Sequence, residues 1–178
     1  MNFLDRHFGR LGNRMFQIAA LYAYSKDLDV DYYFQDPKWF EKYKQDIKIL
    51  FGESIGYEDK IAIHFRRGDY ITTHKDFYVD LNKTDYYKKA MAEFPNEKFL
   101  LFSDDNKWLV ENWPGYEYAT GDEETDLKRF ASCKGHIIAN SSWSWWGAYL
   151  GKGKVIAPKA WFIDGVERTV CPKEWLRL

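Results

Sequence analysis

Two arginines, an aspartate and a histidine gather in the stretch HFRRGDY, residues 64–70, directly after the apolar run IAI. The guanidinium groups of Arg66 and Arg67 are always charged and present a planar fork of donors that matches phosphate oxygens. The same residues could instead form ordinary surface ion pairs with Asp69. The stretch therefore indicates a phosphate-binding site, but alone it leaves the ion-pair interpretation open.

Two serines open the stretch SSWSWWG, residues 141–147, which follows the apolar segment GHIIAN. Serines at the start of a helix cap it, and the N–H groups there also attract anions. Ser141 and Ser142 therefore predict either a second group of phosphate ligands or a plain helix cap followed by aromatic core residues. We expect Trp145 and Trp146 to be mainly structural, because aromatic side chains most often fill a core.

A third stretch, FGRLGNRMFQ at residues 8–17, places glycines at the start of a helical pattern. Gly9 and Gly12 allow a ligand to approach the backbone closely, with Asn13 beside them. The stretch matches neither the GxGxxG nor the Walker pattern, so it is weak by itself. All three stretches place phosphate-binding groups at a helix N-terminus or a strand end, and together they predict one phosphate site.

From residue 60 onward, short apolar runs alternate with amphipathic segments. The pattern predicts strands at residues 61–65, 98–105, 116–120, 135–140 and 154–158, and helices at 84–94 (with Thr84 as N-cap), 106–113, 123–133 and 141–151. Such alternation is typical of a parallel α/β sheet with crossover helices. Ligands bind at the carboxyl ends of the strands in these sheets, where the arginine and serine stretches lie.

The first 60 residues are less regular. They predict a helix at residues 11–27, a strand at 30–36 and a second helix at 37–52 that Pro37 opens. We expect an α/β protein of two Rossmann-like lobes: a reduced N-terminal lobe, residues 1–58, and a C-terminal lobe, residues 59–178. A phosphate site between two such lobes is the layout of a nucleotide-sugar transferase.

The composition argues against several other classes of protein. Charged residues make up 30% of the 178 residues and the net charge is −1, which gives no support to nucleic-acid or broad membrane-surface binding. Cys133 and Cys171 lack metal-ligand spacing, so we expect reduced, buried thiols in a cytoplasmic protein. The charged N-terminus does not resemble a signal peptide, and the longest uncharged run, residues 135–151, is too short to span a bilayer comfortably. Peripheral membrane contact stays open.

The motifs also resemble those of a known family. GRLGNRMFQ, HFRRGDY, FSDD and NSSWSWWGAYL occur in the order and context of the α-1,2-fucosyltransferases of glycosyltransferase family 11. They are similar to that family's Gly-Leu-Gly-Asn opening, its His-x-Arg-Arg-Gly-Asp motif and its Ser-Ser-x-Ser-Trp-Trp motif. YFQDPKWFEKYKQDI, ahead of the arginine motif, is similar as well, so the resemblance covers the chain from residue 9 to about residue 160.

The resemblance implies a GT-B fold, GDP-fucose as the donor, a galactoside or other glycan as the acceptor, inversion at the anomeric carbon and no metal cofactor. It implies that Arg66 holds the donor phosphates and that His64 lies near the nucleotide, both as catalytic residues. Asp126, one helix upstream of the serines, would read guanine. The other donor-binding residues that we expect are Gly9, Gly12, Asn13, Arg67, Asp69, Ser141 and Ser142.

The general base for the acceptor hydroxyl stays open among Asp5, His7 and Asp69. Of these, Asp69 is better suited to orienting the arginines, since it would be ion-paired.

Two other classes of protein also stay open. A metal-dependent GT-A transferase would use the Asp-x-Asp pattern of Asp29 and Asp31, with Asp104 and Asp105. A non-catalytic sugar-binding protein would use the aromatic residues, which make up 19% of the chain and can stack on sugar faces.

Overall fold

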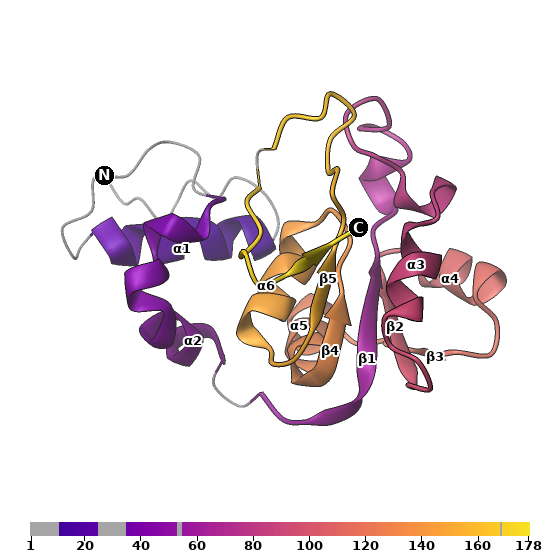
Figure 1. Ribbon diagram of the computed structural model, residues 1–178, viewed down its shortest axis with the longest axis horizontal. Helices are drawn as coiled ribbons and strands as arrows, with labels where there is room; N and C mark the ends of the chain where they lie inside the picture. The colour runs from indigo at the N-terminus through magenta and orange to yellow at the C-terminus, as the bar shows by residue number, and fades with distance from the viewer. Residues whose placement is uncertain (1–10, 25–34, 53–54, 168) are drawn as a thin grey trace.

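The computed structural model describes residues 11–24, 35–52, 55–167 and 169–178 of this α/β protein (Figure 1). Its strands are β1 (Glu58–Phe65), β2 (Phe99–Ser103), β3 (Glu117–Tyr118), β4 (Cys133–Ile137), β5 (Val155–Ala157) and β6 (Leu176–Arg177). Its α-helices are α1 (Leu11–Tyr24), α2 (Lys44–Gly52), α3 (Tyr86–Ala92), α4 (Asn106–Asn112), α5 (Glu123–Ser132) and α6 (Ser142–Leu150). Short 3-10 turns lie at Pro37–Trp39, Glu41–Tyr43, Gly68–Tyr70 and Leu81–Lys83.

The strands form one sheet in the order β3-β2-β1-β4-β5-β6, and every neighbouring pair is parallel. The chain moves outward in one direction from β1 to β3 and then returns to the other side of β1 with β4. The carboxyl ends of β1 and β4 therefore flank a crevice at the point where the strand order reverses, and open α/β sheets bind their ligands there. This arrangement confirms the predicted parallel, Rossmann-like sheet.

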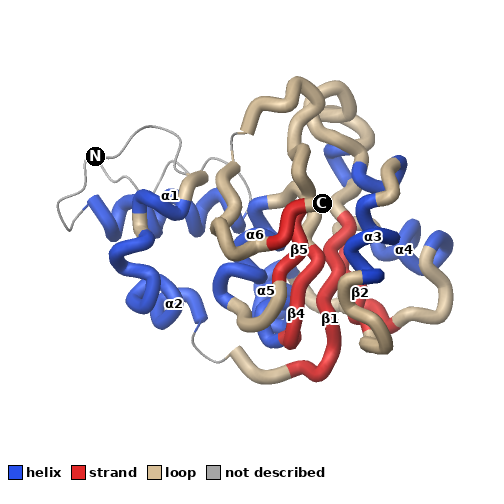
Figure 2. The backbone as a smooth tube through the Cα atoms, viewed as in Figure 1, coloured by secondary structure: helices blue, strands red, loops and turns tan. Residues whose placement is uncertain are grey.

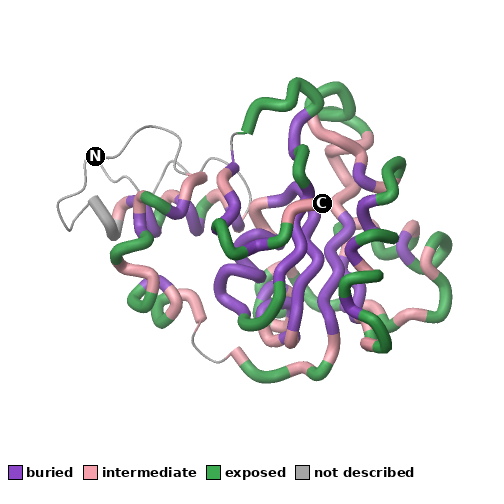
Figure 3. Tube along the Cα trace, viewed as in Figure 1, coloured by how far each residue is buried: buried purple, intermediate pink, exposed green. Residues whose placement is uncertain are grey.

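Helices cover both faces of the sheet, with α5 and α6 on one side and α3 and α4 on the other (Figure 2). Successive side chains of a strand point to opposite faces, and β1 follows this rule. Ala62 belongs to the core shared with α5 and α6, whereas Ile61 and Ile63 belong to the core shared with α3. The strands of the sheet are buried over most of their length (Figure 3), as expected for parallel strands covered on both faces.

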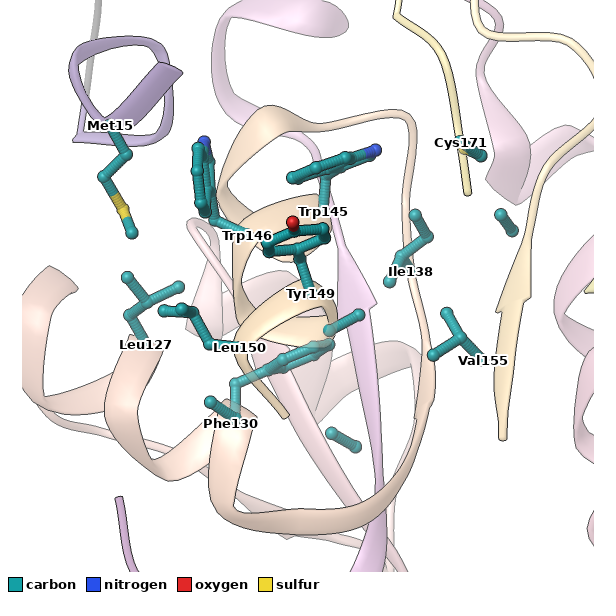
Figure 4. Close-up of a cluster of buried hydrophobic side chains, with 14 of the residues drawn as sticks. Met15, Leu127, Phe130, Ile138, Trp145, Trp146, Tyr149, Leu150, Val155 and Cys171 are labelled. Atoms are coloured by element: carbon teal, nitrogen blue, oxygen red, sulfur yellow. The ribbon is translucent and has the colours of Figure 1, made fainter. Parts of the chain in front are cut away.

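A hydrophobic cluster joins the N-terminal helices to α6. Figure 4 shows part of this cluster, with Met15 of α1 on the side of Trp146. The ring of Phe16 in α1 lies 4.7 Å from Trp145, and Phe40 stacks on Trp146 with ring centroids 5.5 Å apart. Both tryptophans are 0% exposed, which confirms that they are mainly structural. Residues 11–52, where described, therefore pack onto the sheet domain through the same core as α6.

Most predicted elements are confirmed, and the differences have local causes. The predicted helix at residues 37–52 is α-helical only from Lys44, because Asp36 accepts the N–H of Lys38 and begins a 3-10 turn instead. Helix α3 begins at Tyr86 with Asp85 at the N-cap position, although the Thr84 hydroxyl does accept the N–H of Tyr86. The predicted strand at 30–36 lies mostly outside the described residues.

Three further expectations can be compared with the structure. Cys133 and Cys171 are buried and unpaired with each other, which confirms the predicted thiols. Within the described ranges, no helix has both the length and the apolar character needed to cross a bilayer. The same ranges contain no group of three or more His, Cys, Asp or Glu residues arranged to hold a metal ion.

Candidate active site

A cavity of about 460 Å³ lies at the carboxyl ends of β1, β2 and β4. It brings together the three stretches that the sequence singled out, although they are far apart along the chain. The residues that line it include Gly12 and Asn13 of α1, His64 at the end of β1, Arg66 and Asp69 after β1, Ser103 and Asp104 at the end of β2, Glu123 and Asp126 of α5, and Ser141 and Ser142 at the start of α6. The arrangement confirms that these segments share one edge of the sheet.

Arg66 is held at this edge by two carboxylates. One terminal nitrogen of its guanidinium forms an ion pair with Asp104 and the other with Asp69, and the Arg66 side chain is only 9% exposed. Its guanidinium also lies 4.9 Å from the ring centre of Tyr70. These two ion pairs account for two of the five N–H groups of the guanidinium.

Asp104 has a positioning role that the sequence analysis missed. Besides its ion pair with Arg66, it accepts the backbone N–H of Arg67 at 2.8 Å. The signal was present in FSDD at the end of a strand, but the pairing partner depends on β1 and β2 lying side by side. Asp105 does something different, because its side chain accepts the N–H of Trp108 and caps α4.

Arg67 points away from the cavity that Arg66 lines. Its guanidinium lies 3.8 Å from the ring centre of Trp108 in α4, with Asp105 at 3.9 Å. Adjacent residues at the end of a strand project to opposite faces, so the two neighbouring arginines separate. The structure therefore brings Arg66 to the other predicted site residues and places Arg67 against α4.

The start of α1 rests directly on the start of α6. A Cβ atom at Gly12 would lie 2.6 Å from both the carbonyl carbon of Ser142 and the nitrogen of Trp143, so this approach requires glycine. Next to it, the Ser142 hydroxyl donates to Oδ1 of Asn13 at 2.8 Å, and the Gln35 amide donates to the same oxygen at 3.1 Å. These contacts hold both helix N-termini at the cavity edge.

Ser141 occupies the N-cap position of α6, as predicted, but its hydroxyl makes no capping hydrogen bond. Its backbone is extended, with φ −138° and ψ 129°, and the residue is buried. Because no side chain of the cap residue engages them, the first N–H groups of α6 remain suited to an anion from the cavity.

Asp126 lines the same cavity from the first turn of α5. The helix cap is Asp122, which accepts the N–H of Thr125 at 2.7 Å, so Asp126 does not cap α5 but adds to the negative charge of its first turn. Oδ1 of Asp126 accepts the N–H of Gly121 at 3.1 Å. Loss of water on burial raises the pKa of the Asp126 carboxyl above its ordinary value.

His64 lies near the end of β1 and is the first residue of the arginine stretch. It is 5% exposed and lines the cavity, with its ring centre 4.8 Å from that of Trp143. Of the other predicted site residues, Gly9 lies outside the described part of the chain. So do Asp5 and His7, the candidates for the base, and Asp29 and Asp31, the candidates for a metal site.

Comparison with known proteins adds an independent observation. Residues 21–177 match the profile of the family described as glycosyl transferase family 11. The chain is 33% identical over 132 residues to the O-antigen biosynthesis glycosyltransferase WbnK of Escherichia coli, a match that covers 66% of this chain and 44% of that protein. It is 27% identical over 176 residues to an alpha-1,2-colitosyltransferase of Escherichia coli, covering 82% of this chain and 61% of that protein.

The chain thus spans about half the length of the curated relatives that it matches. No solved structure matches it with significance.

Proposed function

Because the chain belongs to glycosyl transferase family 11, we propose that it is an inverting glycosyltransferase that moves fucose from GDP-fucose to a glycan hydroxyl. The 2-hydroxyl of a galactoside is the expected acceptor. The observation that carries this proposal is that Arg66, held by Asp69 and Asp104, lines the same cavity as the N-terminus of α6. A fixed cation and a helix N-terminus that face one cavity suit a diphosphate.

The donor phosphates would lie between Arg66 and the first turn of α6. As the bond between the sugar and the β-phosphate oxygen breaks, negative charge develops on the departing GDP. Donors that are already in place stabilise that charge without reorganising, and this favours the transition state over the ground state. We propose that Arg66, the α6 N–H groups and the Gly12–Asn13 turn do this in place of a metal ion.

The base would lie against Asp126. The pairing edge of guanine presents two adjacent donors, N1–H and the N2 amino group, and one carboxylate can accept both. Asp126 of α5 lines the same cavity as Arg66, and burial removes part of the hydration of its carboxyl group. A partly desolvated carboxylate favours a ligand that supplies donors and disfavours one that does not.

The proposed architecture is GT-B with a reduced N-terminal lobe, residues 1–58. The sheet of residues 58–177 supports this as the donor-binding half, because its cavity lies at the switch point. The helices α1 and α2 would be what remains of the acceptor-side half, and they pack on α6.

A thermal-shift panel tests the donor. GDP, GDP-fucose, GDP-mannose, UDP-galactose and simple β-galactosides are each added to the protein, with Arg66→Ala as the matched variant. A ligand at about 100 times its Kd adds roughly 2.7 kcal/mol of stability, which raises Tm by roughly 5–10 °C for a chain of this size. We expect a shift with GDP and GDP-fucose that Arg66→Ala reduces.

Two results would redirect the proposal. A shift with galactosides but with no nucleotide would favour a non-catalytic sugar-binding protein. Turnover that stops in EDTA and returns with manganese would favour a metal-dependent transferase. Since one relative is named an alpha-1,2-colitosyltransferase, a donor that carries colitose is the second candidate if GDP binds and fucose is not transferred.

A further inference from the structure

Two rim loops, residues 71–80 after β1 and 158–167 after β5, rise together above the carboxyl ends of the strands (Figures 1 and 2). They pair through an isolated antiparallel bridge between Tyr78 and Phe162. The buried Asn140 amide donates to one carbonyl of each loop, Val79 and Trp161, at 2.9 Å. The rim loops are therefore fixed to each other and to the end of β4, and they extend the wall of the cavity.

The rim loops give this wall an aromatic surface. Tyr78 stacks on Tyr70 with ring centres 3.7 Å apart and an angle of 4°, and Phe162 lies 5.3 Å from Tyr78. The Tyr70 hydroxyl donates to the carbonyl of Asn140 at 3.0 Å, which fixes the pair. All three rings line the same cavity as Arg66. Flat aromatic surfaces of this kind suit the apolar face of a sugar ring.

Tyr70, Tyr78 and Phe162 form what we call the aromatic wall, and His74 lies next to it and also lines the cavity. Its backbone N–H donates to the carbonyl of Asp69 at 2.8 Å, and Nε2 of its ring lies 4.0 Å from Oδ2 of Asp69. Its ring meets Tyr78 edge-on, with centres 6.3 Å apart. The other carboxylate oxygen of Asp69, Oδ1, is engaged by Arg66. Asp69 thus lies between the guanidinium and the imidazole.

Asp69 is already engaged by Arg66, whereas the imidazole of His74 lines the cavity. A proton on Asp69 would break its ion pair with Arg66. Histidine, in contrast, is the most common general base in enzymes. A neutral imidazole has one ring nitrogen that can accept a proton.

We propose that His74 is the general base for the acceptor hydroxyl, with Asp69 as its positioning residue, and that the aromatic wall of the rim loops seats the acceptor sugar. This inference rests on the proposed function. The acceptor O–H bond breaks as its proton passes to the unprotonated ring nitrogen of His74, and the oxygen forms a bond to C1 of the donor sugar. The electron pair of the broken C1–O bond stays on the β-phosphate oxygen of GDP. The imidazolium then releases its proton to water, which His74 can reach because its side chain is 50% exposed.

Several charged groups share the cavity with His74 and bear on its pH response. They are Arg66 and Asp69 on its own segment, Asp104 after β2, and Glu123 and Asp126 on α5. Of these, Asp69 makes the direct contact with the ring, through Oδ2 at 4.0 Å from Nε2. Tyr70 stays neutral, because burial raises its pKa well above the usual value.

The test compares His74→Gln with Lys75→Ala, an exposed neighbour on the same turn that does not line the cavity. GDP release from GDP-fucose is measured with lactose and methyl β-galactoside as acceptors, and GDP binding is measured by calorimetry. General bases contribute typically 100- to 10,000-fold, so we expect His74→Gln to lose roughly 100-fold or more in kcat with GDP affinity unchanged. We expect the kcat of the parent to fall at acidic pH, as is usual for a histidine base, and this fall to be absent in His74→Gln. His74→Ala should regain part of its rate with added imidazole.

Each other result is decisive. If the parent transfers and His74→Gln retains its rate within about threefold, the assignment of His74 is overturned while the proposed function stands. If the parent binds GDP-fucose but leaves it intact with both acceptors, the assignment falls together with the proposed galactoside transfer. If the parent fails to bind GDP at all, the donor proposal itself is overturned. A similar loss in Lys75→Ala would show that the turn is only structural and would also overturn the assignment.

Discussion

The Ser142 hydroxyl donates a hydrogen bond of 2.8 Å to Oδ1 of Asn13, although the two residues stand 129 positions apart in the chain. This bond joins the first residue of α6 to the first turn of α1. The glycine and serine stretches, each weak alone, therefore form one structural unit at the edge of the cavity.

Gly12→Ala should disturb this junction. The added Cβ would meet the backbone of Ser142 and Trp143 at 2.6 Å, and backbone atoms cannot move aside as a flexible side chain can. We expect a loss of roughly 1–3 kcal/mol in the free energy of unfolding and weaker GDP binding, measured by thermal melting and calorimetry.

The control for Gly12→Ala is Gly56→Ala, because a Cβ at Gly56 meets nothing within 4 Å. Equal melting temperatures for the two variants would contradict the close contact between α1 and α6.

Arg66→Ala should abolish measurable transfer. Loss of a charge-assisted donor that acts in the transition state costs roughly 3–4 kcal/mol, or a few hundred-fold or more in rate. Arg66→Lys should recover little, because an ammonium group cannot replace a fork whose two terminal nitrogens engage Asp69 and Asp104. Single-turnover kinetics with saturating donor would measure both, and full activity in Arg66→Lys would remove the bidentate role.

Asp126→Asn should leave the stability of the free protein unchanged or slightly higher, while it lowers the affinity for GDP. Burial raises the pKa of Asp126, so the folded state binds a proton at a pH where the unfolded state has released it. Ionisation of this group therefore lowers stability as pH rises above its unfolded pKa, and the neutral amide should leave Tm at pH 7 unchanged or slightly higher.

The same substitution should weaken GDP binding and narrow the difference in affinity between GDP and UDP. A carboxylate has two oxygens that can accept the two guanine donors, whereas an amide has one oxygen and an NH2 group that is itself a donor. Calorimetric titration with the two nucleotides measures that gap. A constant GDP-to-UDP affinity ratio in Asp126→Asn would take Asp126 out of base recognition.

Trp146→Ala should destabilise the fold. The ring is 0% exposed and packs on Phe16, with centroids 4.9 Å apart, and on Phe40. Truncation of a fully buried tryptophan costs roughly 3–5 kcal/mol, which denaturant unfolding measures. Ile49→Ala is the control, since Ile49 is 65% exposed. A stable Trp146→Ala protein with impaired acceptor binding would reverse the structural assignment.

Much of the architecture could be predicted from the sequence, because helices and strands follow local periodicity. The alternation after residue 60 predicted five of the sheet's strands and the helices between them. The two-residue strand β6 was not predicted, since Leu176–Arg177 is too short to show a period and forms only through its pairing with β5. Cys133 is both the C-cap of α5 and the first residue of β4, a boundary that composition cannot place.

The candidate site, like the fold, could be predicted only in part from the sequence. Residue types alone indicated that Arg66 and Ser142 could bind phosphate, since charge and donor geometry belong to each side chain. Asp126 was expected only from the family resemblance, as a group that reads guanine. The residue types could not show which of Arg66 and Arg67 faces the cavity, because that depends on the face of the sheet to which each side chain after β1 projects. Nor could it show that Asp104 holds Arg66, or that His74 lies beside Asp69 in the cavity wall. Such contacts depend on the register of β1 against β2 and on the pairing of the rim loops, and only the tertiary structure decides these.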